Sequence, residues 1–204
     1  TWRVDVTPVS AYETGPTLSS NVLAIGGLAV TQIPDQTIAE GAAFTTIDLD
    51  DYVEDPAYED NEITWTYFGN TELTVAIDAG THVATVGIPD ADWFGSEDIS
   101  FVATNPAVLR DTSQTKFTVT NVNDAPVITE IGDQPATEDT NLEGLAVTFT
   151  DADPDDTHTI TVVSDEANVT VAHLSGQISG STYDLELAAN WNGTAHITVT
   201  VTDN

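Results

Sequence analysis

The stretch Asp92-Trp93-Phe94-Gly95-Ser96, followed by the alternating run Ile99-Ser100-Phe101-Val102-Ala103, decides the fold because it returns 98 positions later. Its second version is Asn190-Trp191-Asn192-Gly193-Thr194, followed by Ile197-Thr198-Val199-Thr200-Val201. Alternation of apolar and polar residues with a period of two is typical of a half-buried β-strand. Each Trp-x-Gly turn is therefore expected to lead into a strand, with Trp93 and Trp191 anchoring the core beneath the turn. A sugar-stacking role for these two residues is the less favoured alternative.

A second motif has the same spacing, since Ile33-Pro34-Asp35-Gln36 returns as Ile131-Gly132-Asp133-Gln134. Two matches at one spacing indicate two tandem copies of one domain. Both copies contain short segments rich in Val, Ile, Thr and aromatic residues, separated by Gly, Pro, Asn and Asp, which is typical of β-strands. Further strands are expected at 63–68, 73–77, 83–86, 117–120, 146–150, 159–163, 169–172 and 183–187. About seven strands per copy predict an all-β chain of two immunoglobulin-like sandwiches.

The two ends of the repeat are unequal. We expect an extension over residues 1–28, a first sandwich over 29–122, and a second over 123–204 that lacks its final strand. Residues 2–8 alternate as a strand does and resemble 117–120, the strand that the second copy lacks. We therefore predict that this strand completes the second sandwich of another copy, which gives head-to-tail self-association. A fragment of a longer tandem protein, or a strand that folds back on its own chain, is the alternative.

Composition excludes several partners. The chain has 34 acidic residues against 3 basic ones, and its net charge is -31. Nucleic acid and anionic membrane surfaces repel such a chain, so we expect neither nucleic-acid binding nor membrane insertion. Self-repulsion also opposes compaction, and bound cations or high salt would relieve it. A halophilic origin is the alternative explanation for the acidity.

The junction between the copies carries a second chemical pattern. It begins with Asn121-Val122-Asn123-Asp124-Ala125-Pro126, and Phe149-Thr150-Asp151-Ala152-Asp153-Pro154 follows it, with carboxylates two residues apart. Alternating oxygen-bearing residues suit a hard divalent cation, which takes 6–8 oxygen ligands. An EF-hand is excluded, because Asp156 occupies its glycine position and Val162 its bidentate glutamate position.

These motifs resemble those of cadherins and of the bacterial and archaeal cadherin-like repeats of surface adhesins. The first is similar to the interdomain linker, and the second to the family's Asp-x-Asp element. Val201-Thr202-Asp203 is similar to the strand-end aspartate, and Glu40 to the acid that the preceding domain supplies. The resemblance implies a cadherin-like fold and one to three Ca²⁺ ions, with the ligands Glu40, Asn123, Asp124, Asp151, Asp153 and Asp203.

The chain also departs from the family pattern. Asn121 stands where the linker usually begins with Asp, and Ala125 replaces a later Asn. The acidic pair that normally precedes the penultimate strand is ambiguous, because either Asp90 with Asp92 or Glu97 fits. A further acidic cluster at 48–56 is either a calcium site of the first sandwich or an ordinary acidic loop.

Catalytic motifs are missing. The four histidines are isolated and the chain has no cysteine, which disfavours a transition-metal site. We therefore expect a non-enzymatic protein. We also expect it to be secreted to the cell surface after removal of a signal peptide. Its predicted role is a calcium-stiffened structural subunit of a filament or surface layer. The alternative is an adhesin stalk, or a segment that recognises cell-surface carbohydrate or protein through Trp2, Trp65 or Tyr58.

Overall fold

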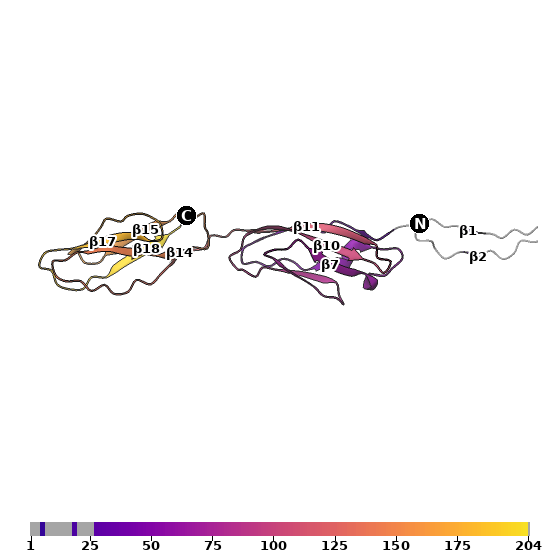
Figure 1. Cartoon of the computed structure of the whole chain (residues 1–204), viewed down its shortest axis with the longest axis horizontal. Coiled ribbons are helices and arrows are strands. Elements are labelled where there is room, and N and C mark those ends of the chain that lie inside the picture. The colour runs from indigo at the N-terminus through magenta and orange to yellow at the C-terminus, as the bar shows by residue number, and fades with distance from the viewer. Residues whose placement is uncertain (1–4, 7–17, 20–26, 204) are drawn as a thin grey trace, which may run out of the picture. The chain divides into compact units, whose positions relative to one another are not determined.

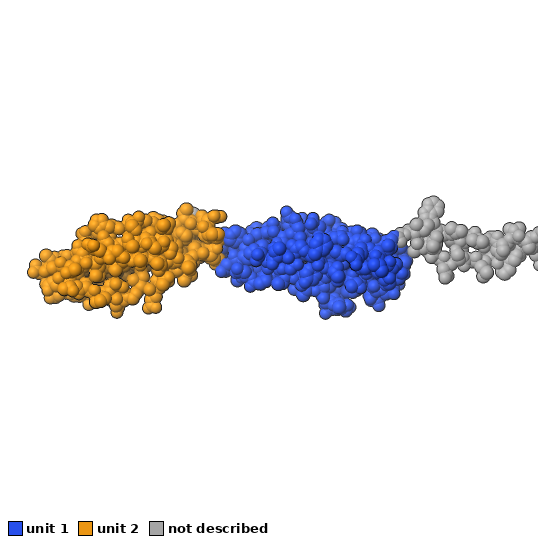
Figure 2. Space-filling model, in the orientation of Figure 1, with its two compact units in different colours: residues 1–122 blue, residues 123–204 orange. Residues whose placement is uncertain are grey.

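The computed structural model describes residues 5–6, 18–19 and 27–203. The chain divides into two compact units, residues 1–122 and residues 123–204 (Figures 1 and 2). Within the extension, β1 (Asp5–Val6) pairs antiparallel with β2 (Leu18–Ser19). The rest of the proposed donor strand 2–8 lies outside the described residues.

Regular structure in the described part is β-strand, apart from two short 3₁₀ helices, η1 (Leu49–Tyr52) and η2 (Asp60–Glu62). The all-β prediction is therefore confirmed. The described residues contain no helix with the length and hydropathy that a membrane span requires.

Unit 1 is built from two principal sheets and a short strand pair around one core. The four-stranded sheet has the order β4 (Gln36–Ala39), β11 (Arg110–Thr120), β10 (Gly95–Thr104) and β7 (Thr64–Phe68), with β4 parallel to β11. The three-stranded sheet has the order β5 (Ile47–Asp48), β9 (Val83–Gly87) and β8 (Thr74–Ile77). A further pair joins β3 (Ala29–Val30) to β6 (Val53–Glu54).

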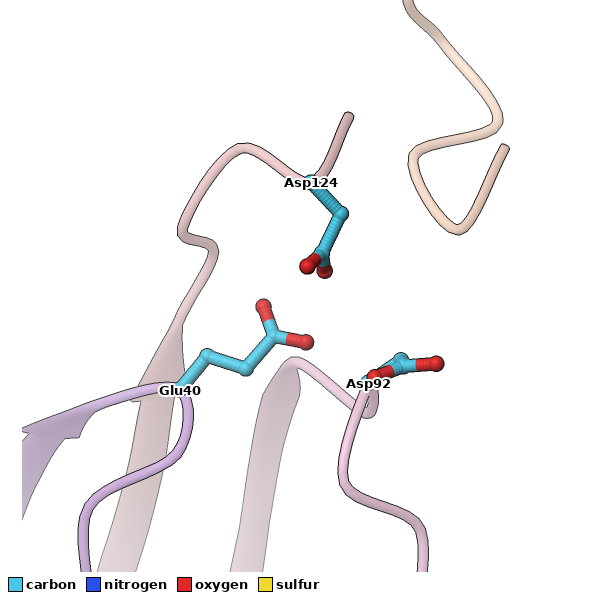
Figure 3. Close-up of side chains that lie close together, drawn as sticks. All are labelled: Glu40, Asp92 and Asp124. Atoms are coloured by element: carbon cyan, nitrogen blue, oxygen red, sulfur yellow. The ribbon is translucent and has the colours of Figure 1, made fainter. Parts of the chain in front are cut away.

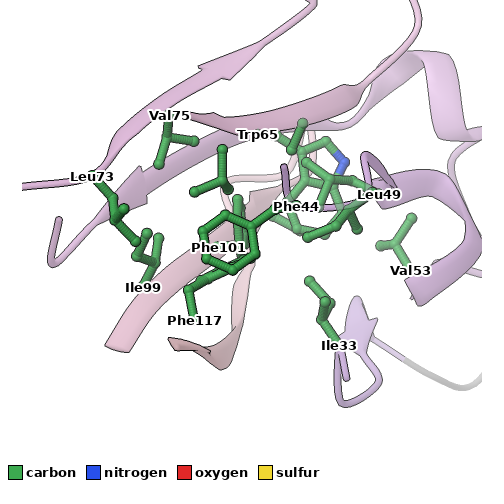
Figure 4. Close-up of a cluster of buried hydrophobic side chains, with 14 of the residues drawn as sticks. Ile33, Phe44, Leu49, Val53, Trp65, Leu73, Val75, Ile99, Phe101 and Phe117 are labelled. Atoms are coloured by element: carbon green, nitrogen blue, oxygen red, sulfur yellow. The ribbon is translucent and has the colours of Figure 1, made fainter. Parts of the chain in front are cut away.

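Strands β10 and β11 supply the centre of the unit 1 core. Ile99, Phe101 and Phe117 are fully buried (Figure 4). The ring of Phe117 packs edge-on against Phe44 at a centroid distance of 5.0 Å, and against Phe101 at 6.5 Å. Alternate residues of a strand point to one face, so the inward residues of β10 and β11 fill the core of this sandwich.

Unit 2 has a smaller core. Its three-stranded sheet has the order β13 (Leu142–Val147), β17 (Ser181–Leu187) and β16 (Val169–Ala172). Two further pairs are β15 (Thr159–Ser164) with β18 (Ile197–Thr202), and β12 (Val127–Ile128) with β14 (Phe149–Thr150). Its buried apolar residues are Val147, Phe149, Ile160, Val169, Tyr183, Leu185 and Val201.

The Trp-x-Gly turn has the same steric basis in both units. A Cβ at Gly95 would lie 3.0 Å from Cζ2 of Trp93, and one at Gly193 would lie 2.9 Å from Cζ2 of Trp191. Both indoles are half-buried and pack against the core of their own unit. Glycine is thus required where the ring lies over the backbone, and both tryptophans act as structural anchors.

The pairing of β10 in unit 1 differs from that of its counterpart in unit 2. In unit 1, β10 pairs with β7 on one side and with β11 on the other. Its counterpart in unit 2, β18, pairs with β15. No strand of the described residues pairs with the other edge of β18.

Candidate functional sites

Three carboxylates converge at one end of unit 2. Asp151 follows β14 directly, Asp203 follows β18 directly, and Asp156 lies in the loop between β14 and β15. One oxygen of each lies within 4.8 Å of the others. Two oxygens that both bind one Ca²⁺ at about 2.3–2.6 Å are at most about 5.2 Å apart. The spacing of the three oxygens therefore fits ligation of a single ion.

The first residues of unit 2 are bonded to this acidic loop. Oδ2 of the buried Asp153 accepts the backbone N–H of Asp124 at 2.7 Å. The amide of Asn123 donates to Oδ2 of Asp203 at 3.1 Å. The Asp153 N–H in turn donates to Oδ1 of Asp151 at 3.0 Å. Five of the six predicted ligands thus take part in hydrogen bonds at this end of unit 2.

Asp156 is the residue that sequence reasoning missed as a ligand. Its Oδ2 atom is buried and has no hydrogen-bond partner. Burial raises the pKa of this carboxyl group, and the negative charges of Asp153, Asp151 and Asp203 raise it further. An unpartnered carboxylate oxygen among three other acids is what a cation would satisfy, so the donor set fits calcium. The cluster of four acids over 151–156 was visible in the sequence, but the loop path that brings Asp156 toward Asp203 was not.

Asp151 is held differently from Asp156. Its pKa lies below the ordinary range because it accepts the Asp153 N–H and a hydrogen bond from His158. Nε2 of His158 lies 2.7 Å from Oδ2 of Asp151, and the imidazole packs against the Phe149 ring at a centroid distance of 4.6 Å. Asp151 is thus oriented and ionised at the position where a ligand is expected.

A second acidic pair lies at one end of unit 1. Glu40, just after β4, and Asp92, in the turn before β10, bring carboxylate oxygens within 4.8 Å (Figure 3). Oε2 of Glu40 also accepts the N–H of Val122, the last residue of the unit, at 3.1 Å. Of the two sequence alternatives for the partner acid, Asp92 is therefore the one that lies beside Glu40.

Glu97 has a different role. Its buried carboxylate accepts the N–H groups of Thr71, Glu72 and Leu73. These bonds are made within the sheet-to-sheet loop of unit 1, so Glu97 organises that loop. It is not positioned beside Glu40 as a further oxygen ligand.

Several acids of the loop over 48–56 bond to other residues of unit 1. Asp50 lies 2.7 Å from Nδ1 of His82, and Asp55 accepts the Asn105 amide at 2.7 Å. Asp48 caps η1. Within the described residues of this loop, no three carboxylates converge as they do in unit 2.

An open groove runs along unit 2. It has a volume of about 720 Å³, and its walls combine core residues with the rim residues Glu130 and Asp133. The apolar lining includes Ile128, Leu142, Tyr183, Leu185, Trp191, Ile197 and Val199. The groove follows the edge of β18 that no described strand covers.

The equivalent region of unit 1 is closed. Ile99 and Phe101 of β10 are 0% exposed, whereas their counterparts Ile197 and Val199 in β18 are only half-buried. Strand β11 makes the difference, because it pairs with β10 and inserts Phe117 into the core. The groove of unit 2 therefore lies at the position that β11 occupies in unit 1.

The described residues proposed to recognise carbohydrate are buried or half-buried rather than exposed. Trp65 is 8% exposed and belongs to the unit 1 core, so its predicted role as an exposed sugar-stacking residue is wrong. Its inward direction follows from its place in β7, where only this residue of five is buried. Tyr58 is half-buried against the same core, and Trp2 lies outside the described residues.

Residues 123–204 match the family model described as "Bacterial Ig domain". No curated protein sequence matches the chain. Together with the observed sheets, the family match makes unit 2 immunoglobulin-like, and domains of this kind are usually extracellular.

Solved structures that resemble the chain include tandem cadherin domains. Protocadherin Gamma B2 extracellular cadherin domains 3–6 share 14% identity at a TM-score of 0.49, covering 85% of this chain and 46% of that one. Human CDH23 EC21-23 shares 16% identity at a TM-score of 0.47, covering 91% and 67%. An endo-fucoidan hydrolase from glycoside hydrolase family 107 shares 16% identity at a TM-score of 0.37, covering 87% and 28%.

The chain spans less than half the length of the first protocadherin structures that it matches. The family match and the sheet arrangement, rather than these distant similarities, carry the immunoglobulin-like assignment.

Proposed function

We propose that the protein is a non-enzymatic extracellular structural subunit, in which calcium stiffens two tandem sandwiches and strand exchange joins one copy to the next. The observation that carries this proposal is the groove of unit 2, where Ile197 and Val199 are only half-buried although their counterparts beside β11 in unit 1 are fully buried. An uncovered strand edge beside apolar side chains readily accepts an added strand.

The predicted donor is the N-terminal strand 2–8 of a second copy. Donor and acceptor then lie in different parts of the sequence, so the contact is heterologous. Such a contact forms a ring if its rotation closes and a filament if it does not. A filament or surface layer is the form that we propose.

Calcium has a separate task in this proposal. Asp153 and Asp203 already bond to Asp124 and Asn123 at the start of unit 2. An ion held by the surrounding acids would fix these linker residues on their own domain, and a second ion at Glu40 and Asp92 would do the same for the end of unit 1. Each ion would also offset part of the net charge of -31.

Assembly and its calcium dependence are tested together by negative-stain electron microscopy and light scattering, with calcium and with a chelator. Deletion of residues 1–10 and the groove variant Val199→Asp should each abolish assembly. Thr200→Asp is the matched control, because this neighbour on β18 is exposed. Assemblies that persist in both test variants would refute strand exchange.

An adhesin stalk is the second candidate, and the match to a bacterial immunoglobulin-like domain favours it. A stalk requires stiffness without strand exchange between copies. Calcium-dependent extension of a chain that stays monomeric, measured by small-angle X-ray scattering, would support this candidate over the filament.

A further inference from the structure

We propose that Asn192 is a self-modification site, at which the backbone nitrogen of Gly193 displaces the side-chain amide and leaves an aspartate or isoaspartate in the Trp-x-Gly turn of unit 2. The reaction needs no partner other than water. It is independent of the calcium sites and of strand exchange.

The chemistry is open to an asparagine because its side chain and the next peptide nitrogen can close a small ring. The nitrogen of Gly193 attacks Cγ of Asn192, the new bond completes a succinimide, and the Cγ–Nδ2 bond breaks. The amide leaves as ammonia, which takes up the proton of the Gly193 N–H. Water then adds to either carbonyl carbon of the ring and breaks its bond to the nitrogen, which gives aspartate or isoaspartate. Two groups that one chain holds side by side react without the cost of a bimolecular encounter.

The residue after Asn192 is glycine for a structural reason. A Cβ at Gly193 would lie 2.9 Å from Cζ2 of Trp191, so the indole keeps this position free of a side chain. The missing Cβ also leaves the Gly193 nitrogen unhindered and its backbone free to change conformation. Unit 1 has Phe94 before the equivalent Gly95, and the chain contains the pair Asn-Gly once. The turn that anchors the core therefore creates the reactive pair in unit 2.

Both reacting groups are accessible in the loop between β17 and β18. The turn that precedes them is fixed, since the N–H of Asn190 donates to Oδ1 of Asp139 at 2.7 Å. Asn192 and Gly193 themselves are exposed. Among the described residues, neither the Asn192 side chain nor the Gly193 N–H makes a hydrogen bond. Nothing in this part of the chain therefore holds the nucleophile away from the side chain.

Hydrogen bonds protect most other asparagines of the described chain, because the N–H of the following residue is already donated. At Asn168, the Val169 N–H donates to the Glu166 carbonyl at 3.0 Å, and Nδ2 of Asn168 itself donates to Oε1 of Glu166 at 2.7 Å. Asn105 is followed by Pro106, which has no N–H. The following N–H is bonded at Asn61, Asn70, Asn121, Asn123, Asn168 and Asn190, whereas Asn141 is held through its own side-chain oxygen.

Access to Asn192 does not depend on the open groove. Its equivalent in unit 1, at the spacing of 98 that relates the copies, is Phe94. Phe94 is 37% exposed although β11 pairs with β10 there. A side chain at this place in the turn therefore faces solvent even where a strand lies beside it.

Either product changes the turn. Both add a negative charge to a chain whose net charge is already -31. Isoaspartate also routes the main chain through the former side chain, which inserts one carbon between Trp191 and Gly193. Because the Trp191 ring lies against the Gly193 position and packs on the core of unit 2, this insertion should displace the indole and weaken its packing.

The test incubates the folded chain in mildly alkaline buffer and follows it by peptide mapping with mass spectrometry. Alkaline buffer speeds the reaction because the attacking nitrogen must lose its proton. We expect the peptide that carries Asn192 to change from amide to acid before any other, as two isomeric products. The peptide that carries Asn168 is the internal control and should stay unmodified over the same period.

The denatured chain in the same buffer supplies the reference. Conversion of Asn192 in the denatured chain but not in the folded one would show that the fold protects the pair, which overturns self-modification at this site. Equal conversion at several asparagines of the folded chain would overturn the selectivity for Asn192.

The effect on the turn is measured separately by differential scanning calorimetry. The isoaspartate form, isolated by chromatography, should melt at a lower temperature than the unmodified chain. Asn192→Asp is the matched control, because it adds the charge without the extra carbon, and it should melt close to the parent. Equal melting of the isoaspartate form and Asn192→Asp would overturn the proposed effect of the main-chain insertion.

Discussion

The carboxylate of Asp153 accepts the backbone N–H of Asp124 at 2.7 Å, which ties the first residues of unit 2 to its acidic loop. This bond does not depend on an ion, because donor and acceptor are both in the protein. Asp153 is also 3% exposed, so it has a structural task in addition to any part in calcium binding.

Replacing Asp153 with Ala should therefore destabilise unit 2 even without calcium. The Asp124 N–H would lose its acceptor, at a cost of about 1–3 kcal/mol in the free energy of unfolding. Urea denaturation in a chelator, followed by intrinsic tryptophan fluorescence, measures the effect. Asp155→Ala is the control, since Asp155 is exposed, and equal stability of the two variants would contradict the prediction.

Asp156→Asn should have opposite effects with and without calcium. Burial and three neighbouring acids raise the pKa of Asp156. When a carboxyl group has a higher pKa in the folded state than in the unfolded state, the folded protein becomes less stable as the pH rises above the unfolded-state pKa. Removing its charge should thus raise the melting temperature in a chelator at pH 7.

The same variant should show a smaller increase in melting temperature on addition of calcium, because one ligand charge is lost. Differential scanning calorimetry with calcium and with magnesium separates specific binding from general screening. An undiminished calcium response would show that Asp156 is not a ligand.

Glu97→Gln should destabilise unit 1 by about 1–3 kcal/mol, because an amide cannot accept all the N–H groups of Thr71, Glu72 and Leu73 that the carboxylate binds. Burial disfavours the charge on Glu97, but the hydrogen bonds from Glu72 and Thr71 outweigh this and lower its pKa.

The stabilisation by Glu97 is thus complete above the ordinary glutamate pKa and is lost as the pH falls through the lowered value. Urea denaturation at neutral and acidic pH should show the variant and the parent converging in acid. Glu72→Gln, at an exposed side chain, should leave stability unchanged. A constant difference between the Glu97 variant and the parent at every pH would argue against this account.

Gly193→Ala should destabilise unit 2 by about 1–3 kcal/mol through overpacking, because the new Cβ would lie 2.9 Å from the Trp191 ring. Gly95→Ala should cost more in unit 1, since Gly95 also has a φ of +151° that non-glycine residues rarely adopt. Gly132→Ala has open space and an ordinary φ. Thermal unfolding in which all three variants behave alike would exclude the steric role of the turn.

Much of the strand pattern could be predicted because alternation is local. The expected strand at 169–172 coincides with β16, and those at 83–86 and 159–163 differ by one residue from β9 and β15. Strand β11 was underestimated, since it begins at Arg110 rather than 117. Its inward positions there are Ser113 and Thr115, which are buried because their hydroxyls bond to Ile33. Such partners are distant in sequence, so apolar alternation could not reveal them.

By itself, the sequence determined the tandem repeat, the β-rich fold and the concentration of acids near the junction, because all three depend on the order and spacing of residue types. The tertiary structure decided which acids meet. It placed Asp156 with Asp151 and Asp203, chose Asp92 rather than Glu97 as the neighbour of Glu40, and turned Trp65 into the core. It also showed that β18 has an uncovered edge beside half-buried side chains. These outcomes depend on loop paths and sheet pairing between residues far apart in the chain, which local periodicity does not encode.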